Sequence, residues 1–470
     1  MAHENFDLII IGAGPAGLFL ARELLMARPT RKIAMIDNGR SISKRVCPLI
    51  EQGSCIQCRT CHVVYGSGGA GMYSDGKLSL WPAGSGLKTI LGDESTVVFL
   101  NQYVLDAFAA GLGTHGSITK ASDARESPLV LEAEKNALTI KCYDVLHVGT
   151  EQIQIYCGHL EKDLIERGLR FFPSTTCVEV DKFGEIFTVE LKTPKGTTET
   201  FYSQQVAFAT GKASGLFLRN MLAGLSVQTE FNAIELGVRV ETSRDSVKDL
   251  SDCHLDAKIK LNLANDVEVR SFCLCNGGYL VSCYYDNFAS NERICTISGF
   301  SFESKKSNNS NFGILVRKQL PAPIDPIRVQ LGIVQAINRA SGRGATVVQR
   351  YGDFCKGIAS SIDSLAINSV KSTLDPITPT NLRWLLPEFV TSSIETYMTQ
   401  LSKIAPGVGS EDTLLHAPVW ELCADRIMVN RGMETNISGL FVLGDASGWA
   451  RGIVQAATTG VAAARYMLSQ

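Results

Sequence analysis

The chain has 470 residues, of which 45% are hydrophobic and 20% charged, and its formal net charge is −2. That length accommodates two or three packed lobes, and the near-neutral charge argues against nucleic-acid binding. No apolar run is long enough to span a bilayer, and the N-terminus lacks the basic start and cleavage site of a secretory signal. Fourteen cysteines without such a signal favour reduced thiols, so we expect a cytoplasmic protein without integral membrane contact.

Residues 1–45 predict a strand, a helix and a second strand. The apolar run Leu8–Ile11 is typical of a strand buried on both faces of a parallel sheet. Three glycines in Gly-x-Gly-x-x-Gly spacing follow, and this spacing permits a tight turn, contact with a pyrophosphate and close packing of helix on strand. The second strand ends at an aspartate whose carboxylate can accept both ribose hydroxyls of an adenosine. The predicted nucleotide-binding residues here are Gly12, Gly14, Pro15, Ala16, Gly17 and Asp37.

Residues 46–86 are rich in cysteine and glycine and show no clear periodicity, which is typical of a long functional loop. The spacing of its cysteines suits the ligands of an iron–sulfur cluster or of a tetrahedral zinc site. A redox-active disulfide and four unligated thiols are the alternatives. The candidate metal ligands are Cys47, Cys55, Cys58 and Cys61.

A glycine-rich stretch closes this loop. Gly69, Ala70 and Gly71 let backbone N–H groups approach a ligand closely, so we predict that they contact a cofactor. Tyr73 and Lys77 follow, and we predict catalytic roles for both, because a lysine beside the reactive ring of a cofactor can orient water or polarise a substrate carbonyl. The alternative is a glycine loop followed by a lysine–aspartate surface pair.

The next segments predict helices over residues 97–112 and 158–168 and a buried strand over residues 205–209. The strand ends in Ala209, Thr210 and Gly211, which we predict to form a second contact with the nucleotide. An ordinary strand-to-turn transition is the alternative.

The middle of the chain, residues 216–400, contains several strand-like segments. Arg239 could reach a substrate anion, although an ion pair with Glu241 is an equal alternative. Cys273 and Cys275 alternate along a predicted strand, so they share a face and do not readily form a disulfide with each other. We expect both cysteines to serve the core rather than catalysis.

Residues 401–470 return to an α/β pattern, with a buried strand over 440–443 that closes in Gly444 and Asp445. A helix of small residues begins at Ile453, directly after Gly452. The aspartate can accept a hydrogen bond from a ribityl hydroxyl, and the positive end of the helix would stabilise the reduced form of a flavin. We predict that these four residues contact the cofactor and that Arg451 adds to the stabilisation, with a surface ion pair as its alternative role.

Several segments spread over most of the chain carry a resemblance to known proteins. They are residues 12–17, the cysteine-rich stretch leading into 68–78, and residues 147–150, 270–278, 352–354 and 444–456. On these segments the chain resembles an uncharacterised family of FAD-dependent dehydrogenases in the glutathione-reductase-like flavoprotein superfamily. The resemblance implies a two-domain flavoprotein that binds FAD in extended form, and it implies little about the substrate.

Together these features predict an α/β fold, an interrupted Rossmann-like FAD-binding domain with an inserted β-rich α+β substrate domain. We expect the FAD-binding domain at residues 1–45, 87–215 and 401–470. The cysteine- and glycine-rich flavin loop is expected at 46–86, and the substrate domain at 216–400.

The predicted function is that of an FAD-dependent oxidoreductase, a dehydrogenase or reductase that exchanges hydride between flavin N5 and a small organic substrate. No second dinucleotide motif follows a strand, so NAD(P)H is expected only as a transient donor. One alternative is an electron-transfer protein, in which an iron–sulfur cluster or zinc on the loop cysteines accompanies the flavin and an electron-transfer partner docks. The other is an FAD-binding module without redox turnover.

Overall fold

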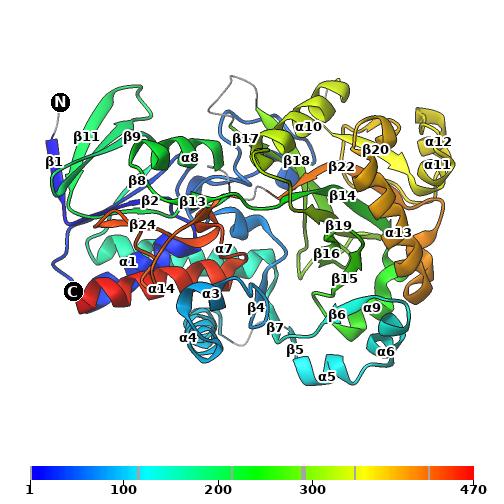
Figure 1. Ribbon diagram of the computed structural model, residues 1–470, viewed down its shortest axis with the longest axis horizontal. Coiled ribbons are helices and arrows are strands. Elements are labelled where there is room, and N and C mark those ends of the chain that lie inside the picture. Colours follow the sequence, from blue (N-terminus) through cyan, green and yellow to red (C-terminus); the bar gives the residue numbers. More distant parts are fainter. Residues whose placement is uncertain (1–2, 114–116, 213–214, 287–292, 343–345, 422–423) are drawn as a thin grey trace.

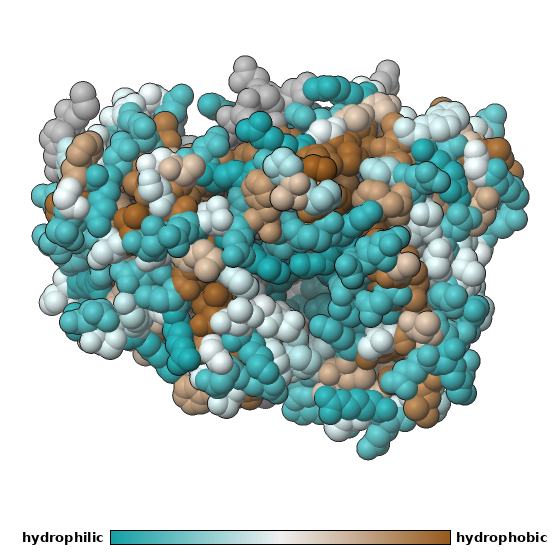
Figure 2. Space-filling model, in the orientation of Figure 1, coloured by the Kyte–Doolittle hydropathy of each residue, from teal (hydrophilic) through white to brown (hydrophobic). Residues whose placement is uncertain are grey.

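The computed structural model describes residues 3–113, 117–212, 215–286, 293–342, 346–421 and 424–470. These residues form two regions side by side, a parallel-sheet region that contains both chain ends and a large-sheet region on the right of Figure 1. Figure 2 shows that hydrophilic residues cover most of the same face of the molecule. Among the residues described, no helix has both the length and the apolar character needed to cross a membrane.

Five parallel strands form the centre of the parallel-sheet region. Both faces of this sheet are covered, so all four residues of its central strand are buried. Leu8 and Ile10 pack toward one face, while Ile9 and Ile11 pack toward the other. The strands lie in the order β24 (Leu440–Val442), β12 (Val206–Phe208), β2 (Leu8–Ile11), β3 (Ile33–Asp37) and β8 (Arg170–Pro173).

Two helices from opposite ends of the chain pack closely on this sheet, and Figure 1 shows them alongside each other as α1 in blue and α14 in red. Gly460 permits the close approach, because a Cβ atom there would lie 2.2 Å from the carbonyl oxygen of Ala16. The four long helices that share one apolar core with this face are α1 (Pro15–Ala27), α4 (Glu94–Leu112), α7 (Gly149–Glu166) and α14 (Ile453–Ser469).

The opposite face of the parallel sheet carries a second, smaller sheet and one helix. Their apolar side chains form one cluster with those of β2 and β3. The elements are α8 (Gly215–Gly224) and four strands in the order β1 (His3–Phe6), β11 (Thr198–Ser203), β10 (Ile186–Lys192) and β9 (Thr176–Phe183).

An eight-stranded, mostly antiparallel sheet is the centre of the large-sheet region. Helices α10 (Pro326–Ala340) and α13 (Glu388–Ile404) place their apolar residues in the same core as this sheet. The strand order is β21 (Thr378–Pro379), β20 (Val347–Arg350), β22 (Leu414–Trp420), β14 (Ile234–Ser243), β19 (Asn309–Lys318), β16 (Val267–Cys275), β15 (Lys258–Leu263) and β6 (Thr139–Lys141).

Short elements connect and flank these two regions. Three small sheets are formed by β4 (Lys77–Ser79), β7 (Val145–His147) and β5 (Ser117–Thr119), by β17 (Tyr279–Tyr285) and β18 (Ile294–Phe300), and by β13 (Thr229–Glu230) and β23 (Arg426–Ile427). The shorter helices are α2 (Pro48–Gln52), α3 (Leu87–Leu91), α5 (Ala121–Arg125), α6 (Pro128–Lys135), α9 (Lys248–Cys253), α11 (Tyr351–Lys356) and α12 (Ile362–Ile367).

The predicted fold class, a Rossmann-like domain interrupted by a β-rich domain, is confirmed. The sheets nevertheless cross the expected boundaries at residues 215 and 400, because β6 and β22 both belong to the large sheet. Strand β22 is buried along its whole length between β14 and β20. Such pairings between distant segments leave no local signal in the sequence. The helix predicted over 158–168 is α7, which begins at Gly149.

Candidate functional site

A cavity of about 430 Å³ lies between the carboxyl ends of the parallel strands and the large sheet. Its volume is within the roughly 300–1,000 Å³ of typical small-molecule sites, and parallel sheets usually bind ligands at this edge. The predicted cofactor residues that line it are Gly12, Gly14, Pro15, Ala16, Asp37, Gly69, Ala70, Gly71, Ala209, Thr210, Gly211, Gly444, Asp445, Gly452 and Ile453.

The three glycines of the first turn occupy their positions for different structural reasons. Gly12 has a φ of +112°, and a Cβ atom there would lie 2.3 Å from the carbonyl oxygen of Ala209. Gly17 is a packing residue away from the cavity, since its Cβ atom would lie 2.2 Å from the Gly12 oxygen. At Gly14 the space is open: a Cβ atom would meet only the Gly69 Cα, at 3.7 Å, and the Ala209 oxygen, at 4.0 Å. The missing side chain at Gly14 therefore leaves space for a ligand, whereas the missing side chains at Gly12 and Gly17 leave space for neighbouring backbone.

Helix α1 begins at this turn with its backbone donors directed to the cavity. Gly14 is the N-cap residue, and no side chain in the described part of the chain caps the helix. The first N–H groups of a helix lack partners within it and carry the positive end of its dipole. Pro15 has no N–H group, so the free donors at this helix start are the N–H groups of Ala16 and Gly17. Because Gly14, Pro15 and Ala16 line the cavity, these two donors suit a bound phosphate.

Asp37 ends β3 at the same edge of the cavity. Its Oδ2 accepts a hydrogen bond from the Ala13 N–H at 2.9 Å, and its Oδ1 accepts one from the Gly39 N–H at 2.7 Å. These bonds fix the carboxylate, and each oxygen keeps capacity for another donor. Asp37 thus lines the cavity with a fixed carboxylate, and its predicted bond to ribose hydroxyls stays a prediction.

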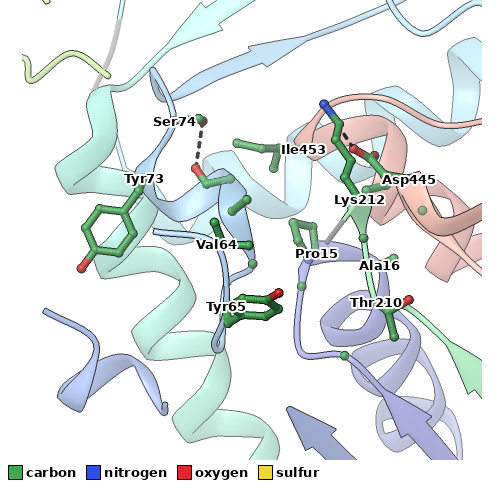
Figure 3. A pocket seen from close by; sticks show the side chains of 18 of the residues that line it. Pro15, Ala16, Val64, Tyr65, Tyr73, Ser74, Thr210, Lys212, Asp445 and Ile453 are labelled. Atoms are coloured by element: carbon green, nitrogen blue, oxygen red, sulfur yellow. Dashed lines mark hydrogen bonds and ion pairs between the residues drawn. The ribbon is translucent and has the colours of Figure 1, made fainter. Parts of the chain in front are cut away.

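The second helix start lies across the cavity, at α14. Gly452 is its N-cap residue with a φ of +107°, and again no described side chain caps the helix. Figure 3 shows Ile453, Asp445 and Lys212 on this side, with Pro15 and Ala16 of α1 close by. Two uncapped helix N-termini, from opposite ends of the sequence, therefore open on one cavity.

Asp445 belongs to a partly buried charged cluster at this end. Its carboxylate lies 4.0 Å from the Lys212 ammonium, which also pairs with Glu421. Burial raises the pKa of Asp445 to about 6, with Glu421 adding to the rise and Lys212 and Arg451 opposing it. Lys212 and Glu421 were not predicted from the sequence, and the position of Lys212 directly after Gly211 is the one local signal for them.

Arg451, a predicted catalytic residue, joins the two regions through Glu235. The fully buried Glu235 accepts from Arg451 at 2.7 Å, from Arg270 at 2.9 Å and from Arg317 at 3.1 Å. Burial opposes ionisation, but these three guanidinium groups hold the pKa of Glu235 well below its usual range. Arg451 therefore lines the cavity and also forms an ion pair. This pair is not the predicted surface pair, because its carboxylate partner Glu235 is fully buried.

Lys77 is held in a buried network. Its Nζ lies 3.2 Å from Asp75 and 3.6 Å from Asp256 and donates to the Leu274 carbonyl. Burial lowers the pKa of Lys77, but the two carboxylates raise it above its usual value overall. Lys77 therefore stays charged and lines the cavity as a fixed cation, which suits electrostatic stabilisation better than proton transfer.

Tyr73 does not direct its reactive group to the cavity. Its hydroxyl donates to the Arg45 carbonyl at 2.5 Å, and Figure 3 shows its ring pointing away from Lys212 and Asp445. Burial raises the pKa of Tyr73 to about 12, opposed by Arg45. The geometry therefore does not support the predicted catalytic role of Tyr73, because the hydroxyl fixes the loop backbone instead.

The four loop cysteines are not gathered into a metal-binding geometry in this structure. Within the described residues, which include Cys47, Cys55, Cys58 and Cys61, no three of their sulfurs come within 4.8 Å of one another. Cys47 is the N-cap residue of the short helix α2 and belongs with Cys61 to one apolar cluster, against which Cys55 packs. Burial raises the pKa of Cys47 to about 11. A cluster or zinc site on these cysteines therefore stays a prediction.

A different pair of cysteines meets on the large sheet. The regular alternation expected for Cys273 and Cys275 is wrong, since β16 has a register shift between Phe272 and Cys275 and Cys273 has a φ of +50°. This bulge brings the two Sγ atoms to 3.6 Å. Arg239 bonds to this pair rather than to Glu241, and it also donates to Asn311. The glycine turn directly after Cys275 is the sequence signal for an irregular strand.

Comparisons with known proteins associate the large-sheet region with a cofactor. Residues 233–419 match a family described as FAD-dependent protein, C-terminal domain-like. The match begins directly before β14 and ends within β22, so it is independent of the glycine-rich turn at residues 12–17. It therefore supports FAD dependence from a second part of the chain.

Similar whole chains were also found. A Clostridium beijerinckii protein named only as uncharacterized is 24% identical over 484 residues, covering 98% of this chain and 80% of that protein. The flavoprotein/dehydrogenase from Cytophaga hutchinsonii is 12% identical with a TM-score of 0.39, covering 99% of this chain and 80% of that chain. Glycine oxidase from Geobacillus kaustophilus is 10% identical with a TM-score of 0.42, covering 99% of this chain and 95% of that chain. The resemblance to the glutathione-reductase-like superfamily in particular stays a prediction.

Proposed function

We propose that this protein is an FAD-dependent oxidoreductase that exchanges hydride between flavin N5 and a small organic substrate. One observation carries the proposal: the uncapped starts of α1 and α14 open on the same cavity, with Asp37 at one end and Asp445 at the other. An extended dinucleotide needs donors for its pyrophosphate and acceptors for hydroxyls at both ends. The family match of residues 233–419 supports FAD as that dinucleotide.

The residues present fit this cofactor. The open space at Gly14 and the first N–H groups of α1 would hold the pyrophosphate, and Asp37 would hold the adenosine ribose. Asp445 would accept from the ribityl chain, and the start of α14 would lie at the pyrimidine edge. When bound, FAD supplies the two-electron chemistry, while the chain positions it and tunes its charge.

The charges on the far wall favour negative charge in the cavity. Around Glu235 and Asp445, four cationic side chains face three carboxylates, which leaves one positive charge in excess. Together with the α14 dipole, this excess would stabilise the anionic reduced flavin. It also suits a substrate that carries a carboxylate. The cations are Lys212, Arg270, Arg317 and Arg451, and the carboxylates are Glu235, Glu421 and Asp445.

Anaerobic spectroscopy of the purified protein tests this proposal. We expect a flavin absorption spectrum, release of FAD on denaturation, and bleaching of the spectrum by an organic donor, with NADH and NADPH as transient alternatives. A protein that retains FAD but is reduced by no donor tested would be a binding module instead. A protein that retains no flavin would contradict the proposal.

A further inference from the structure

Two sulfur atoms lie side by side on the large-sheet wall of the cavity. The Sγ atoms of Cys273 and Cys275 are 3.6 Å apart, about 1.6 Å more than the length of a disulfide bond. The bulge in β16 produces this approach, because in a regular strand the residues would keep the spacing of the pleat. Cys273 lines the cavity, and Cys275 is fully buried behind it.

Cationic groups contact this pair from inside the protein. Nη2 of the fully buried Arg239 lies 3.4 Å from Sγ of Cys273 and 3.5 Å from Sγ of Cys275. Lys77 donates to the carbonyl of Leu274, the residue between the two cysteines.

Hydrogen bonding from the Cys273 thiol lowers the pKa of Cys275, and Arg239 acts in the same direction while burial opposes it. The same hydrogen bond, with burial and Asp75, raises the pKa of Cys273 well above its usual value, so Cys275 is the thiol of the pair that forms the thiolate. Buried cations beside a thiol favour the thiolate, which is the reactive form.

Asp75 completes the cluster. One of its carboxylate oxygens and both sulfurs lie within 4.8 Å of one another. A metal ion could use three such atoms, but Arg239 and Lys77 already place two positive charges on this group. The arrangement therefore suits thiol oxidation better than cation binding, and Asp75 lies where it can accept a thiol proton.

We propose that Cys273 and Cys275 form a redox-active dithiol–disulfide pair that exchanges two electrons with the flavin in the adjoining cavity. This inference rests on the proposed function, because the oxidised flavin is the electron acceptor. Oxidation of the pair breaks two S–H bonds and forms one S–S bond. The two electrons and one proton pass to the flavin, which gives its anionic reduced form, and the second proton passes to Asp75. In the opposite direction, the reduced flavin returns the two electrons and its proton, Asp75 returns the other proton, and the disulfide reopens to two thiols.

The number of electrons taken up per flavin tests this pair. The air-oxidised protein is titrated anaerobically with dithionite, and a parallel sample is denatured in an alkylating agent for peptide mass mapping. We expect the wild-type protein to take up about four electrons, two for the flavin and two for the disulfide, and Cys275→Ser to take up about half as many. The exposed Cys355 lies on α11, so Cys355→Ser is the matched control and should behave as wild type.

The mapping gives a result that is independent of turnover. In the oxidised sample, a single peptide that contains both Cys273 and Cys275, carries no alkyl group and becomes doubly alkylated only after reduction supports the pair. Cys275→Ser should instead be alkylated at Cys273 without reduction, and Cys273→Ser provides the same test if Cys275→Ser does not fold. A yellow wild-type protein that takes up only about two electrons, with both thiols alkylated, overturns the dithiol pair and leaves the proposed function standing. Stoichiometric zinc or iron lost on Cys275→Ser also overturns it. A protein without flavin overturns both proposals.

Discussion

The two walls of the cavity are built in different ways. The parallel-sheet wall consists mainly of glycine turns and two helix starts, so backbone groups face the ligand. The large-sheet wall consists of charged side chains and a sulfur, such as Arg270 and Cys273 on β16, and buried partners from other strands hold them from behind, such as Glu235 on β14. A backbone wall can bind a cofactor common to many enzymes, whereas the side-chain wall sets charge, redox behaviour and substrate choice. Substitutions in the charged groups, in the sulfur pair and in the cysteine-rich loop should break or sharpen this contrast, with effects that decrease from Glu235 to Cys58.

Glu235 should be the most sensitive position on this wall. Glu235→Gln leaves three guanidinium groups without their buried carboxylate, and loss of one partner of a buried ion pair typically costs about 3–5 kcal/mol. We expect the free energy of unfolding, measured by urea denaturation, to decrease by this amount. The exposed Glu230 on β13 provides the control, since Glu230→Gln should change the free energy of unfolding by less than about 0.5 kcal/mol. Equal effects of both substitutions would contradict the role of Glu235.

Asp445 should make stability fall with increasing pH. Its pKa of about 6 in the folded chain exceeds the ordinary value for aspartate, so the folded state holds the proton more tightly. The free energy of unfolding of the flavin-free protein should therefore decrease between about pH 4 and pH 6, by up to about 3 kcal/mol. Asp445→Asn should remove this decrease. An unchanged pH profile in Asp445→Asn would show that the carboxylate titrates normally.

Arg239 should set the reactivity of the sulfur pair. Arg239→Gln removes the buried cation beside Cys275, and a rise of one unit in the pKa of that thiol slows alkylation at neutral pH about tenfold. Peptide mass mapping after timed iodoacetamide treatment of the reduced protein measures this rate, and Arg239→Lys should restore part of it. Arg328→Gln, at a side chain that is 81% exposed, serves as the control. Unchanged labelling in Arg239→Gln would contradict the electrostatic role.

The smallest effect should come from the loop cysteines, which lie outside any three-ligand group found among the described residues. Cys58→Ser should leave the metal content, the flavin spectrum and electron uptake as in wild type. Metal analysis of both purified proteins checks this expectation. Iron or zinc that is present in wild type and lost in Cys58→Ser would restore the metal site that the cysteine spacing suggests.

The sequence predicted the backbone wall well because its determinants are local. Gly12, Gly14 and Asp37 belong to a short strand–turn–helix–strand pattern that the sequence shows directly, and all three line the cavity in the structure. The C-terminal motif with Asp445 lies on the same cavity for the same reason. Strand ends and helix starts have patterns that a single segment shows.

The side-chain wall could not be predicted in this way. Glu235 and Arg451 are distant in sequence and meet only when the two regions pack. The proximity of Cys273 and Cys275 depends on a bulge that strand periodicity does not show. In the loop, by contrast, the cysteine spacing suggests a metal site, but no three of those sulfurs lie within 4.8 Å of one another among the described residues. Close spacing in sequence therefore did not identify the pair of sulfurs that the fold brings together.

The most direct test of the account is whether one added side chain at Gly14 displaces FAD without unfolding the protein. A Cβ atom there has only ordinary contacts, so Gly14→Val should fold, while its methyl groups occupy the space assigned to the pyrophosphate. Gly332→Val, at an exposed and unobstructed position on α10, is the matched control. We predict that wild type and Gly332→Val release FAD on denaturation and that folded Gly14→Val releases none. FAD retained by Gly14→Val at the wild-type level would contradict the placement of the cofactor.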